Sequence, residues 1–390
     1  MKQYRIICES LKASSDYREL QNYRGRFIDF STNDYLNLGG NPEILEAAYE
    51  AGRKYGCGST GSRLLSGNKE IFEEFEEQIA HDKNTEAALI FNSGYQANMT
   101  VLSALCDERT LDYKKAMLFF DKLNHASLYK AADLCKCTLK RYPNNDQNAL
   151  EDLLKKHKDE DCVKFIVSET VFGMDGNCAN LAELIRLARE YNALLYLDEA
   201  HATGVFGHCG YGLSTDYDLS DITCVIMGTF SKALGVSGAY VACFSDVKDY
   251  LLQKCSGLVY STAPSPLVVG AAQKSWELVG QMNEQRKKLL ETSEHLRVSL
   301  AKHGFDTMNS CSHIIPIKTS SSSEAMKYKE LLANQGILVS AVRRPTVPTP
   351  RLRLALTLEH TKNDRAITYF CNQLYSSSFS GRTGNGPVTG

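Results

Sequence analysis

The sequence has almost no net charge and no long apolar run. Its 390 residues carry 44 Lys and Arg against 46 Asp and Glu, a formal net charge of −2. This balance lacks the basic excess with which proteins bind nucleic acid or anionic membranes. No apolar segment approaches the roughly 20 residues that span a bilayer. We therefore expect neither nucleic acid nor a membrane as a partner.

The cysteines lack the regular spacing of a disulfide framework or a metal site. Thirteen are scattered along the chain. Only Cys135 and Cys137 form a close pair, and no second Cys or His pair completes a zinc site. Scattered cysteines in a chain of this length indicate free thiols in a reducing compartment. We expect no metal and a cytoplasmic location.

A phosphate-binding GxxxxGK[ST] loop is also missing, because the chain contains no Gly-Lys pair. The run Asp198-Glu199-Ala200-His201 spells a DEAH box, but a helicase needs that loop as well. Residues 56–61, GCGSTG, match GxGxxG, yet a helix-like stretch precedes them where a dinucleotide fingerprint requires a strand. We therefore exclude a helicase and assign no dinucleotide site.

The pattern that is present predicts a large α/β sheet. From residue 87, seven short apolar runs alternate with helix-like or loop segments: AALIFNS, AMLFFD, CTLKRYP, KFIVSET, LLYLDEA, TCVIMGTF and GAYVACF. Such alternation favours a mostly parallel sheet with helices on both faces. Farther on, the segment 275–300 has the pattern of one long amphipathic helix.

Two of these runs place an acid, an imidazole and a lysine at strand ends. Asp198 and His201 follow LLYL, and Lys232 follows TCVIMGTF, at the rim where open α/β sheets bind ligands. A lysine can form a Schiff base with pyridoxal 5'-phosphate while a carboxylate keeps the pyridine nitrogen protonated. Taken singly, Asp198 could instead cap a turn and Lys232 could be a solvated surface lysine.

The flanking sequence favours the cofactor. DEAHATGVFG and GTFSKALGVSGAYV resemble the α-oxoamine synthases, pyridoxal-phosphate enzymes that condense an amino acid with an acyl thioester and release carbon dioxide. The resemblance extends from about residue 27 to about residue 361. It implies fold type I of the class I/II aminotransferases, a seven-stranded sheet whose last strand is antiparallel, and a homodimer with shared active sites. Lys232 would bind the cofactor and later remove the substrate Cα proton.

The resemblance also assigns the other site residues. The DKLNHAS motif places His125 against the cofactor ring, and His201 approaches the phenolic oxygen. Residues implied at the phosphate are Ser93, Gly94, Tyr95 and Thr229, with Ser261 and Thr262 reaching the phosphate of the partner subunit's cofactor. Those implied for substrate binding are Arg353 at the amino acid carboxylate, with Arg351 as the second choice, and Asn33. From the residues alone, Ser93 to Tyr95 could equally be a plain helix cap.

Two departures from the family pattern affect these assignments. Gly173 occupies the place of a serine in VFSMDG, and RRPTVPTPRLR is shortened and carries an extra Arg344. We expect Gly173→Ser to leave activity intact or to raise it. Glu169 and Asp175 could orient the site or serve as turn residues.

The resemblance divides the chain into an N-terminal segment 1–45, a large cofactor-binding domain 46–275 and a small C-terminal α/β domain 276–375. A Ser- and Gly-rich tail, 376–390, is expected to be disordered. The stretches STNDYLNL, NSCSHIIPI and AVRRPTVP are most similar to 8-amino-7-oxononanoate synthases of biotin synthesis. They imply L-alanine and pimeloyl-CoA or a pimeloyl-carrier protein as substrates. Alternatives are a glycine C-acyltransferase forming 2-amino-3-ketobutyrate and a non-catalytic regulatory subunit.

Overall fold

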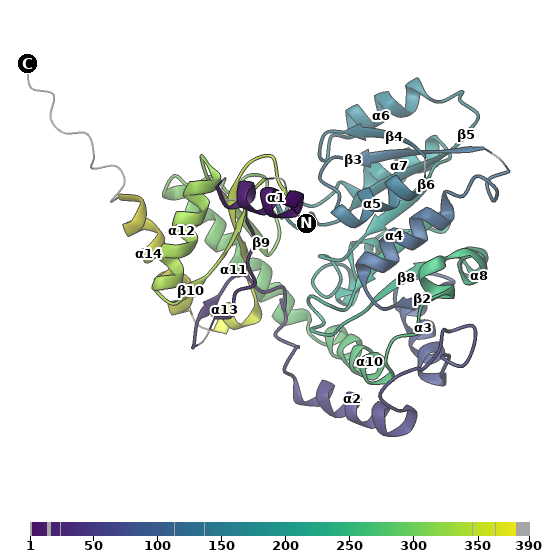
Figure 1. Cartoon of the computed structure of the whole chain (residues 1–390), viewed down its shortest axis with the longest axis horizontal. Helices are drawn as coiled ribbons and strands as arrows, with labels where there is room; N and C mark the ends of the chain where they lie inside the picture. The colour runs from purple at the N-terminus through teal and green to yellow at the C-terminus, as the bar shows by residue number, and fades with distance from the viewer. Residues whose placement is uncertain are drawn as a thin grey trace, which may run out of the picture. The chain divides into compact units, whose positions relative to one another are not determined.

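The computed structural model describes residues 2–13, 17–23, 25–112, 114–135, 137–344, 346–362 and 364–379. These residues form two compact units (Figure 1). The larger unit comprises Asp34–Gly173 and Cys178–Arg286, and the smaller comprises the described residues of Met1–Asn33, Met174–Asn177 and Lys287–Gly390. Of the tail expected at 376–390, residues 380–390 lie outside the described residues.

A seven-stranded sheet forms the centre of the larger unit. Its strand order is β2-β8-β7-β6-β5-β3-β4. All neighbours are parallel except β8, which runs antiparallel to both β2 and β7. The strands are β2 (Ala87–Phe91), β3 (Lys115–Asp121), β4 (Thr138–Tyr142), β5 (Cys162–Glu169), β6 (Leu194–Asp198), β7 (Cys224–Thr229) and β8 (Ala239–Cys243). The seven predicted strands and the antiparallel last strand are confirmed.

The central strands are apolar throughout because both faces of the sheet are covered. In β6, Leu195, Tyr196 and Leu197 are all fully buried, although their side chains alternate between the two faces. On one face, a continuous apolar cluster joins the sheet to α4 (Gly94–Leu105), α5 (Ala126–Cys135), α8 (Ser245–Lys254) and α9 (Ser256–Val259). The remaining helices of this unit are α2 (Pro42–Tyr55), α3 (Glu70–Asp82), α6 (Gln147–Lys156), α7 (Leu181–Glu190) and α10 (Pro266–Gly280).

Local sequence sets where several of these helices begin. Asn41, Ser93, Asp146 and Asn180 precede α2, α4, α6 and α7, and each side chain accepts a hydrogen bond from a backbone N–H of the first turn. Such caps satisfy donors that have no partner within the helix. Ser93 thereby fixes the start of α4 directly after β2.

Polar residues end four neighbouring strands at one edge of the sheet. Asp121 ends β3, Glu169 ends β5, Asp198 ends β6 and Thr229 ends β7. These four strands are parallel, so their carboxyl ends meet at the same edge, where open α/β sheets bind ligands. The fold therefore gathers titratable groups at this edge.

The smaller unit has an antiparallel sheet of order β11-β12-β9 and a parallel pair, β1 and β10. Phe30 lies in its core and stacks on His360, with ring centroids 4.0 Å apart. Its strands are β1 (Ile28–Asp29), β9 (Ile314–Lys318), β10 (Ile337–Leu338), β11 (Ser340–Val342) and β12 (Arg351–Ala355). Its helices are α1 (Lys2–Ala13), α12 (Ser322–Asn334), α13 (Leu358–Lys362) and α14 (Asp364–Phe379), together with most of α11 (Asn283–Lys302).

The single long helix expected at 275–300 was wrong, because the segment contains the end of α10 and the start of α11. Gly280 ends α10, and the backbone N–H of Gln281 closes the last turn on Leu278 O. Glycine weakens a helix interior. Asn283 then opens α11 and accepts a hydrogen bond from the Arg286 guanidinium. The hydrophobic period continues across this break, so the pattern alone could not reveal it.

No described helix combines the length and apolarity needed to cross a membrane. All thirteen cysteines have free thiols.

Candidate active site

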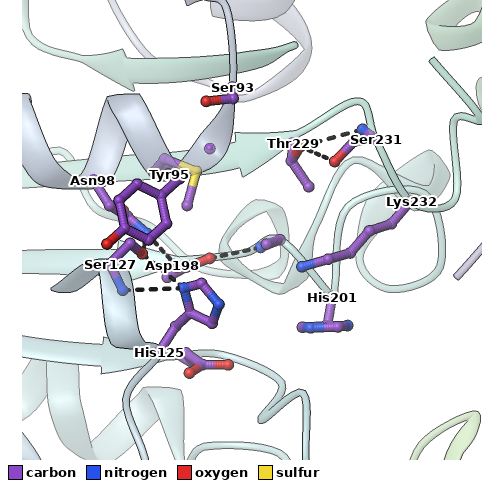
Figure 2. Close-up of a pocket in the computed structure, with 14 residues that line it drawn as sticks. Ser93, Tyr95, Asn98, His125, Ser127, Asp198, His201, Thr229, Ser231 and Lys232 are labelled. Carbon is purple, nitrogen blue, oxygen red and sulfur yellow. Dashed lines mark hydrogen bonds between the residues drawn. The ribbon is translucent and has the colours of Figure 1, made fainter. Parts of the chain in front are cut away.

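A cavity of about 260 Å³ lies at the polar edge of the large sheet. It brings together eight of the residues predicted for cofactor binding or catalysis, drawn from four separate stretches of chain (Figure 2). These are Ser93, Gly94, Tyr95, His125, Asp198, His201, Thr229 and Lys232. The cavity is completed by Asn98, Ser127, Glu169, Ala200, Met227 and Ser231.

Asp198 has a fixed orientation at the end of β6. Its Oδ1 accepts a hydrogen bond from the Ala200 N–H at 2.9 Å, and its Oδ2 accepts one from the Asn98 amide at 2.7 Å. The side chain is only 3% exposed. A buried carboxylate held by two donors has a defined direction, as a partner for a ring nitrogen requires.

Lys232 enters the cavity from the turn that follows β7. Figure 2 shows its side chain reaching inward, with the amine on the side of Asp198 and His201. The turn closes through a hydrogen bond from the Gly235 N–H to Lys232 O at 2.9 Å. Gly235 has φ +67°, and a Cβ there would lie 2.3 Å from the Gly39 backbone nitrogen. Only glycine fits this turn, so the chain fixes where the lysine points.

His201 is held on one side by Tyr35 and packs against Gly173 on the other. The Tyr35 hydroxyl lies 2.7 Å from His201 Nδ1. A Cβ built on Gly173 would lie 2.2 Å from His201 Nε2, well inside van der Waals contact. A side chain at 173 would therefore force the imidazole to move, which favours a loss of activity in Gly173→Ser, opposite to the expectation from the family pattern.

His125 forms another wall of the cavity. Its Nδ1 lies 2.7 Å from Ser127 Oγ, and Tyr95 meets its ring edge to face at a centroid distance of 6.4 Å. Burial lowers the pKa of the imidazole, the charge of Asp198 opposes this shift, and the amine of Lys232 adds to it. A neutral, flat ring is thus presented to the cavity.

Glu169 lies fully buried at the end of β5. Burial, and then the charge of Asp198, raise its pKa well above the ordinary value, while the Gly173 N–H and Lys232 act in the opposite direction. The Gly173 N–H donates to Glu169 Oε2 at 3.2 Å. Glu169 therefore adjoins the cavity as an acid whose burial favours the protonated form.

The start of α4 and the end of β7 supply the predicted phosphate ligands. Ser93 caps α4, because its Oγ accepts from the Gln96 N–H at 3.2 Å, and Gly94 and Tyr95 form the first turn. A helix N-terminus attracts anions. Thr229 Oγ1 donates to Gly238 O at 2.8 Å and accepts from the Ser231 N–H at 3.2 Å. The structure shows that Ser93 caps α4. Phosphate binding by these residues stays a prediction.

Ser261 and Thr262 do not line this cavity. The Asn92 amide donates to Ser261 Oγ at 3.3 Å and to Thr262 O at 2.9 Å, which holds this segment close to the end of β2. Their predicted role concerns the cofactor of a partner subunit and stays a prediction.

The predicted carboxylate ligands lie in the smaller unit. Arg353 donates to the Asn33 side-chain oxygen at 3.0 Å. Arg351 is buried in an ion pair with Asp175 and also donates to Thr349 O at 3.0 Å. Burial raises the pKa of Asp175, and Arg351 opposes the shift. Arg351 therefore already has a carboxylate partner, and the preference for Arg353 stays a prediction.

Comparison with known proteins places the chain in a family. Residues 26–370 match the Aminotransferase class I and II family. The chain belongs to this family. A Magnetococcus marinus protein named "Putative 8-amino-7-oxononanoate synthase" is 41% identical over 377 residues, which are 93% of this chain and 95% of that protein. The resemblance predicted from the sequence is confirmed.

Solved structures of class I and II enzymes share the fold. An 8-amino-7-oxononanoate synthase from Francisella tularensis matches with a TM-score of 0.77 and 27% identity, covering 91% of this chain and 98% of that chain. A lysine-to-alanine variant of a serine palmitoyltransferase from S. paucimobilis, solved with a PLP–myriocin aldimine bound, matches with a TM-score of 0.86 and 26% identity, covering 97% of both chains. The predicted fold class is confirmed. The prediction of a pyridoxal-phosphate enzyme is confirmed at the level of the family.

The cavity of this family member fits pyridoxal phosphate. It offers an amine at Lys232, an oriented carboxylate at Asp198, a flat neutral wall at His125 and a helix N-terminus at Ser93. These groups match the aldehyde, ring nitrogen, ring face and phosphate of the cofactor.

Sequence reasoning missed three polar residues of the site. Asn98 and Ser127 lie within helical patterns, where a buried polar side chain cannot be distinguished from an exposed one. Tyr35 lies in the STNDYLNL stretch that resembles the family, but it meets His201 only through the tertiary fold. Asn98 and Ser127 lie inside α4 and α5, beyond the ends of β2 and β3, so the strand-end signal that located Asp198 did not extend to them.

Proposed function

We propose that this protein condenses L-alanine with a pimeloyl thioester to give 8-amino-7-oxononanoate, carbon dioxide and the free thiol. The observation that carries the chemistry is the convergence of Lys232, Asp198, His125 and His201 on one cavity. The choice of substrates is supported by the 41% identity to a relative named for that product. The acyl donor is pimeloyl-CoA or a pimeloyl-carrier protein.

Bound pyridoxal phosphate supplies an electron sink for the bond changes at the amino acid Cα. Lys232 Nζ would hold the cofactor through its aldehyde, and the same amine would accept the proton removed from Cα. Asp198 holds a proton at the ring nitrogen, and its two hydrogen bonds keep the carboxylate directed there. His125 lies against the ring face.

His201 and the arginines have the remaining roles in this proposal. Tyr35 orients the His201 ring through Nδ1, which leaves Nε2 to donate to the phenolic oxygen of the cofactor. Arg353 binds the amino acid carboxylate by charge-assisted hydrogen bonds. Ser261 and Thr262 bind the phosphate of the partner subunit's cofactor, so the working unit is a homodimer.

The test is a product assay that crosses three amino acids with four acyl thioesters. L-Alanine, glycine and L-serine are each paired with pimeloyl, acetyl, succinyl and palmitoyl coenzyme A, and product and carbon dioxide are measured. The proposal predicts the highest kcat/KM for alanine with pimeloyl coenzyme A. Preference for serine with palmitoyl coenzyme A, the chemistry named for the similar palmitoyltransferase, or for glycine with acetyl coenzyme A would replace the substrates. No turnover with any pair would indicate a non-catalytic subunit.

A further inference from the structure

Two buried polar side chains connect Asp198 to His125. Asn98, on the second turn of α4, is 1% exposed, and Ser127, on the first turn of α5, is fully buried. The Asn98 Nδ2 donates to Asp198 Oδ2 at 2.7 Å and to Ser127 Oγ at 3.0 Å. Ser127 Oγ in turn lies 2.7 Å from His125 Nδ1 (Figure 2). The four side chains form one continuous hydrogen-bonded chain.

The direction of the first two bonds is fixed by chemistry. The Tyr196 hydroxyl donates to Asn98 Oδ1 at 3.0 Å, and burial raises the pKa of this phenol well above its ordinary value, so the phenol keeps its proton. If the amide were flipped, its oxygen would face the Asp198 carboxylate oxygen at 2.7 Å, two acceptors in contact. The Asn98 amide must therefore present both of its N–H groups, one to Asp198 and one to Ser127.

The direction of the last bond follows. Ser127 Oγ accepts from Asn98 and still has its one O–H proton, which it can donate to His125 Nδ1 at 2.7 Å. The backbone N–H of Ser127 also points at this nitrogen, at 3.3 Å. Two donors directed at Nδ1 leave no place for a proton on it. The ring proton of His125 therefore sits on Nε2.

The charges around His125 agree with a neutral ring. Burial has the largest effect on the His125 imidazole and lowers its pKa. The charge of Asp198 favours the protonated ring, and the charge of Lys232 disfavours it. Tyr95 contributes a ring edge, and Glu169 of the same cavity is itself held protonated by burial. Protonation at Nδ1 would in addition break the hydrogen bond from Ser127.

We propose that Asn98 and Ser127 are positioning residues that orient Asp198 and hold His125 as the neutral tautomer with its proton on Nε2. One amide thus serves both groups. It directs the carboxylate towards the ring nitrogen of the cofactor, and it keeps a second positive charge away from the ring face. The tautomer does not depend on the proposed function, whereas any effect on turnover rests on it.

The tautomer can be measured directly in protein without cofactor. Protein labelled with ¹⁵N-histidine is examined by long-range ¹H–¹⁵N correlation NMR, which separates protonated from unprotonated ring nitrogens, and His125→Gln assigns the signal. The wild type should show an unprotonated Nδ1 and a protonated Nε2 at neutral pH. A proton on Nδ1, or rapid exchange between both tautomers, overturns the inference.

Variants then test the cause. Ser127→Ala removes the donor to the neutral ring, so the pKa of His125 should rise by about 0.5–1 unit and the tautomers should mix. Ser127→Thr keeps the hydroxyl and should restore the wild-type signal. Asn98→Ala should weaken the orientation of both Asp198 and His125. Ser103→Ala, a serine on α4 that bonds only to Thr100 O and lies outside the cavity, is the matched control. Equal His125 titrations in the wild type and Ser127→Ala would contradict the proposal.

The outcomes separate this inference from the proposed function. The predicted tautomer in a protein that turns over no substrate pair refutes the function and leaves the hydrogen-bonded chain intact. Turnover of alanine and pimeloyl coenzyme A by a protein whose His125 carries its proton on Nδ1 refutes the inference alone.

Discussion

The imidazole of His201 occupies the space that a side chain at Gly173 would need. A Cβ on Gly173 would lie 2.2 Å from Nε2 and 2.7 Å from Cδ2 of that ring. The ring cannot move without cost, because the Tyr35 hydroxyl holds its Nδ1 at 2.7 Å and the residue is buried. Glycine at 173 and the observed position of His201 therefore depend on each other.

Gly173→Ala should lower both activity and stability. Overpacking a buried site costs about 1–3 kcal/mol in the free energy of unfolding, and displacement of His201 should reduce kcat at least tenfold in the proposed reaction. Denaturant unfolding and steady-state kinetics measure the two effects. Gly40→Ala is the matched control, since a Cβ there meets nothing within 4 Å. In the double variant with His201→Ala, the stability loss from Gly173→Ala should largely disappear. If it persists, some contact other than the imidazole causes the loss.

Glu169→Gln should stabilise the protein increasingly as pH rises. The raised pKa of Glu169 means that the folded protein keeps its proton at pH values where the unfolded chain has lost it. The stability that wild-type Glu169 contributes is therefore complete below its ordinary pKa, near 4.3, and is lost as pH rises towards the folded-state pKa. Gln is neutral throughout and can still accept from the Gly173 N–H.

Thermal unfolding of wild type and Glu169→Gln at pH 5, 6, 7 and 8 measures this difference. The advantage of the variant should grow steadily across the series. Glu183→Gln, at an exposed position where Arg186 lowers the carboxyl pKa, should show no such growth. A constant difference between Glu169→Gln and wild type would mean that Glu169 is ionised in the folded protein.

Arg351 and Arg353 should respond differently to substitution. Arg351→Ala leaves Asp175 as a buried carboxylate without its partner, which costs about 3–5 kcal/mol of stability. Arg353→Ala removes the proposed ligand of the substrate carboxylate together with its bond to Asn33, so it should raise the KM for the amino acid. Unfolding curves and amino acid titrations are measured for both variants. A higher KM in Arg351→Ala alone, at unchanged stability, would contradict this division.

Asp198→Asn should retain the cofactor and lose activation of Cα. The introduced amide keeps the size of the side chain and can still accept from Asn98, but it cannot hold a proton at the ring nitrogen. Hydrogen exchange at Cα of L-alanine in deuterium oxide, followed by NMR, should become at least a hundredfold slower, while cofactor absorbance persists. Asp133→Asn, on the exposed face of α5, should exchange at the wild-type rate. Exchange by Asp198→Asn at that rate would remove Asp198 from its role.

The sheet was predictable because each strand is a contiguous apolar run. β5, β6 and β7 are buried on both faces, so their sequences carry a signal that needs no tertiary information, and Glu169, Asp198 and Thr229 follow from where the runs stop. Lys232 was predictable because a lysine just beyond such a run has little structural purpose.

The remaining features depend on contacts between distant residues. Asn98 and Asp198 are 100 positions apart, and Tyr35 and His201 are 166 apart. Neither contact produces a periodic pattern in the sequence. The expectation for Gly173→Ser could not take this contact into account, because the space beside Gly173 is filled by a ring that hydrogen-bonds Tyr35. The break between α10 and α11 was also missed, because the hydrophobic pattern continues through it.

The covalent attachment site of the cofactor tests the central claim most directly. Protein loaded with pyridoxal phosphate is reduced with borohydride, digested and mapped by mass spectrometry, with Lys232→Ala and the exposed Lys130→Ala as paired variants. We predict a single modified peptide containing Lys232 in wild type and in Lys130→Ala, and none in Lys232→Ala. A stoichiometric adduct on any other lysine, or one that survives in Lys232→Ala, would contradict the account.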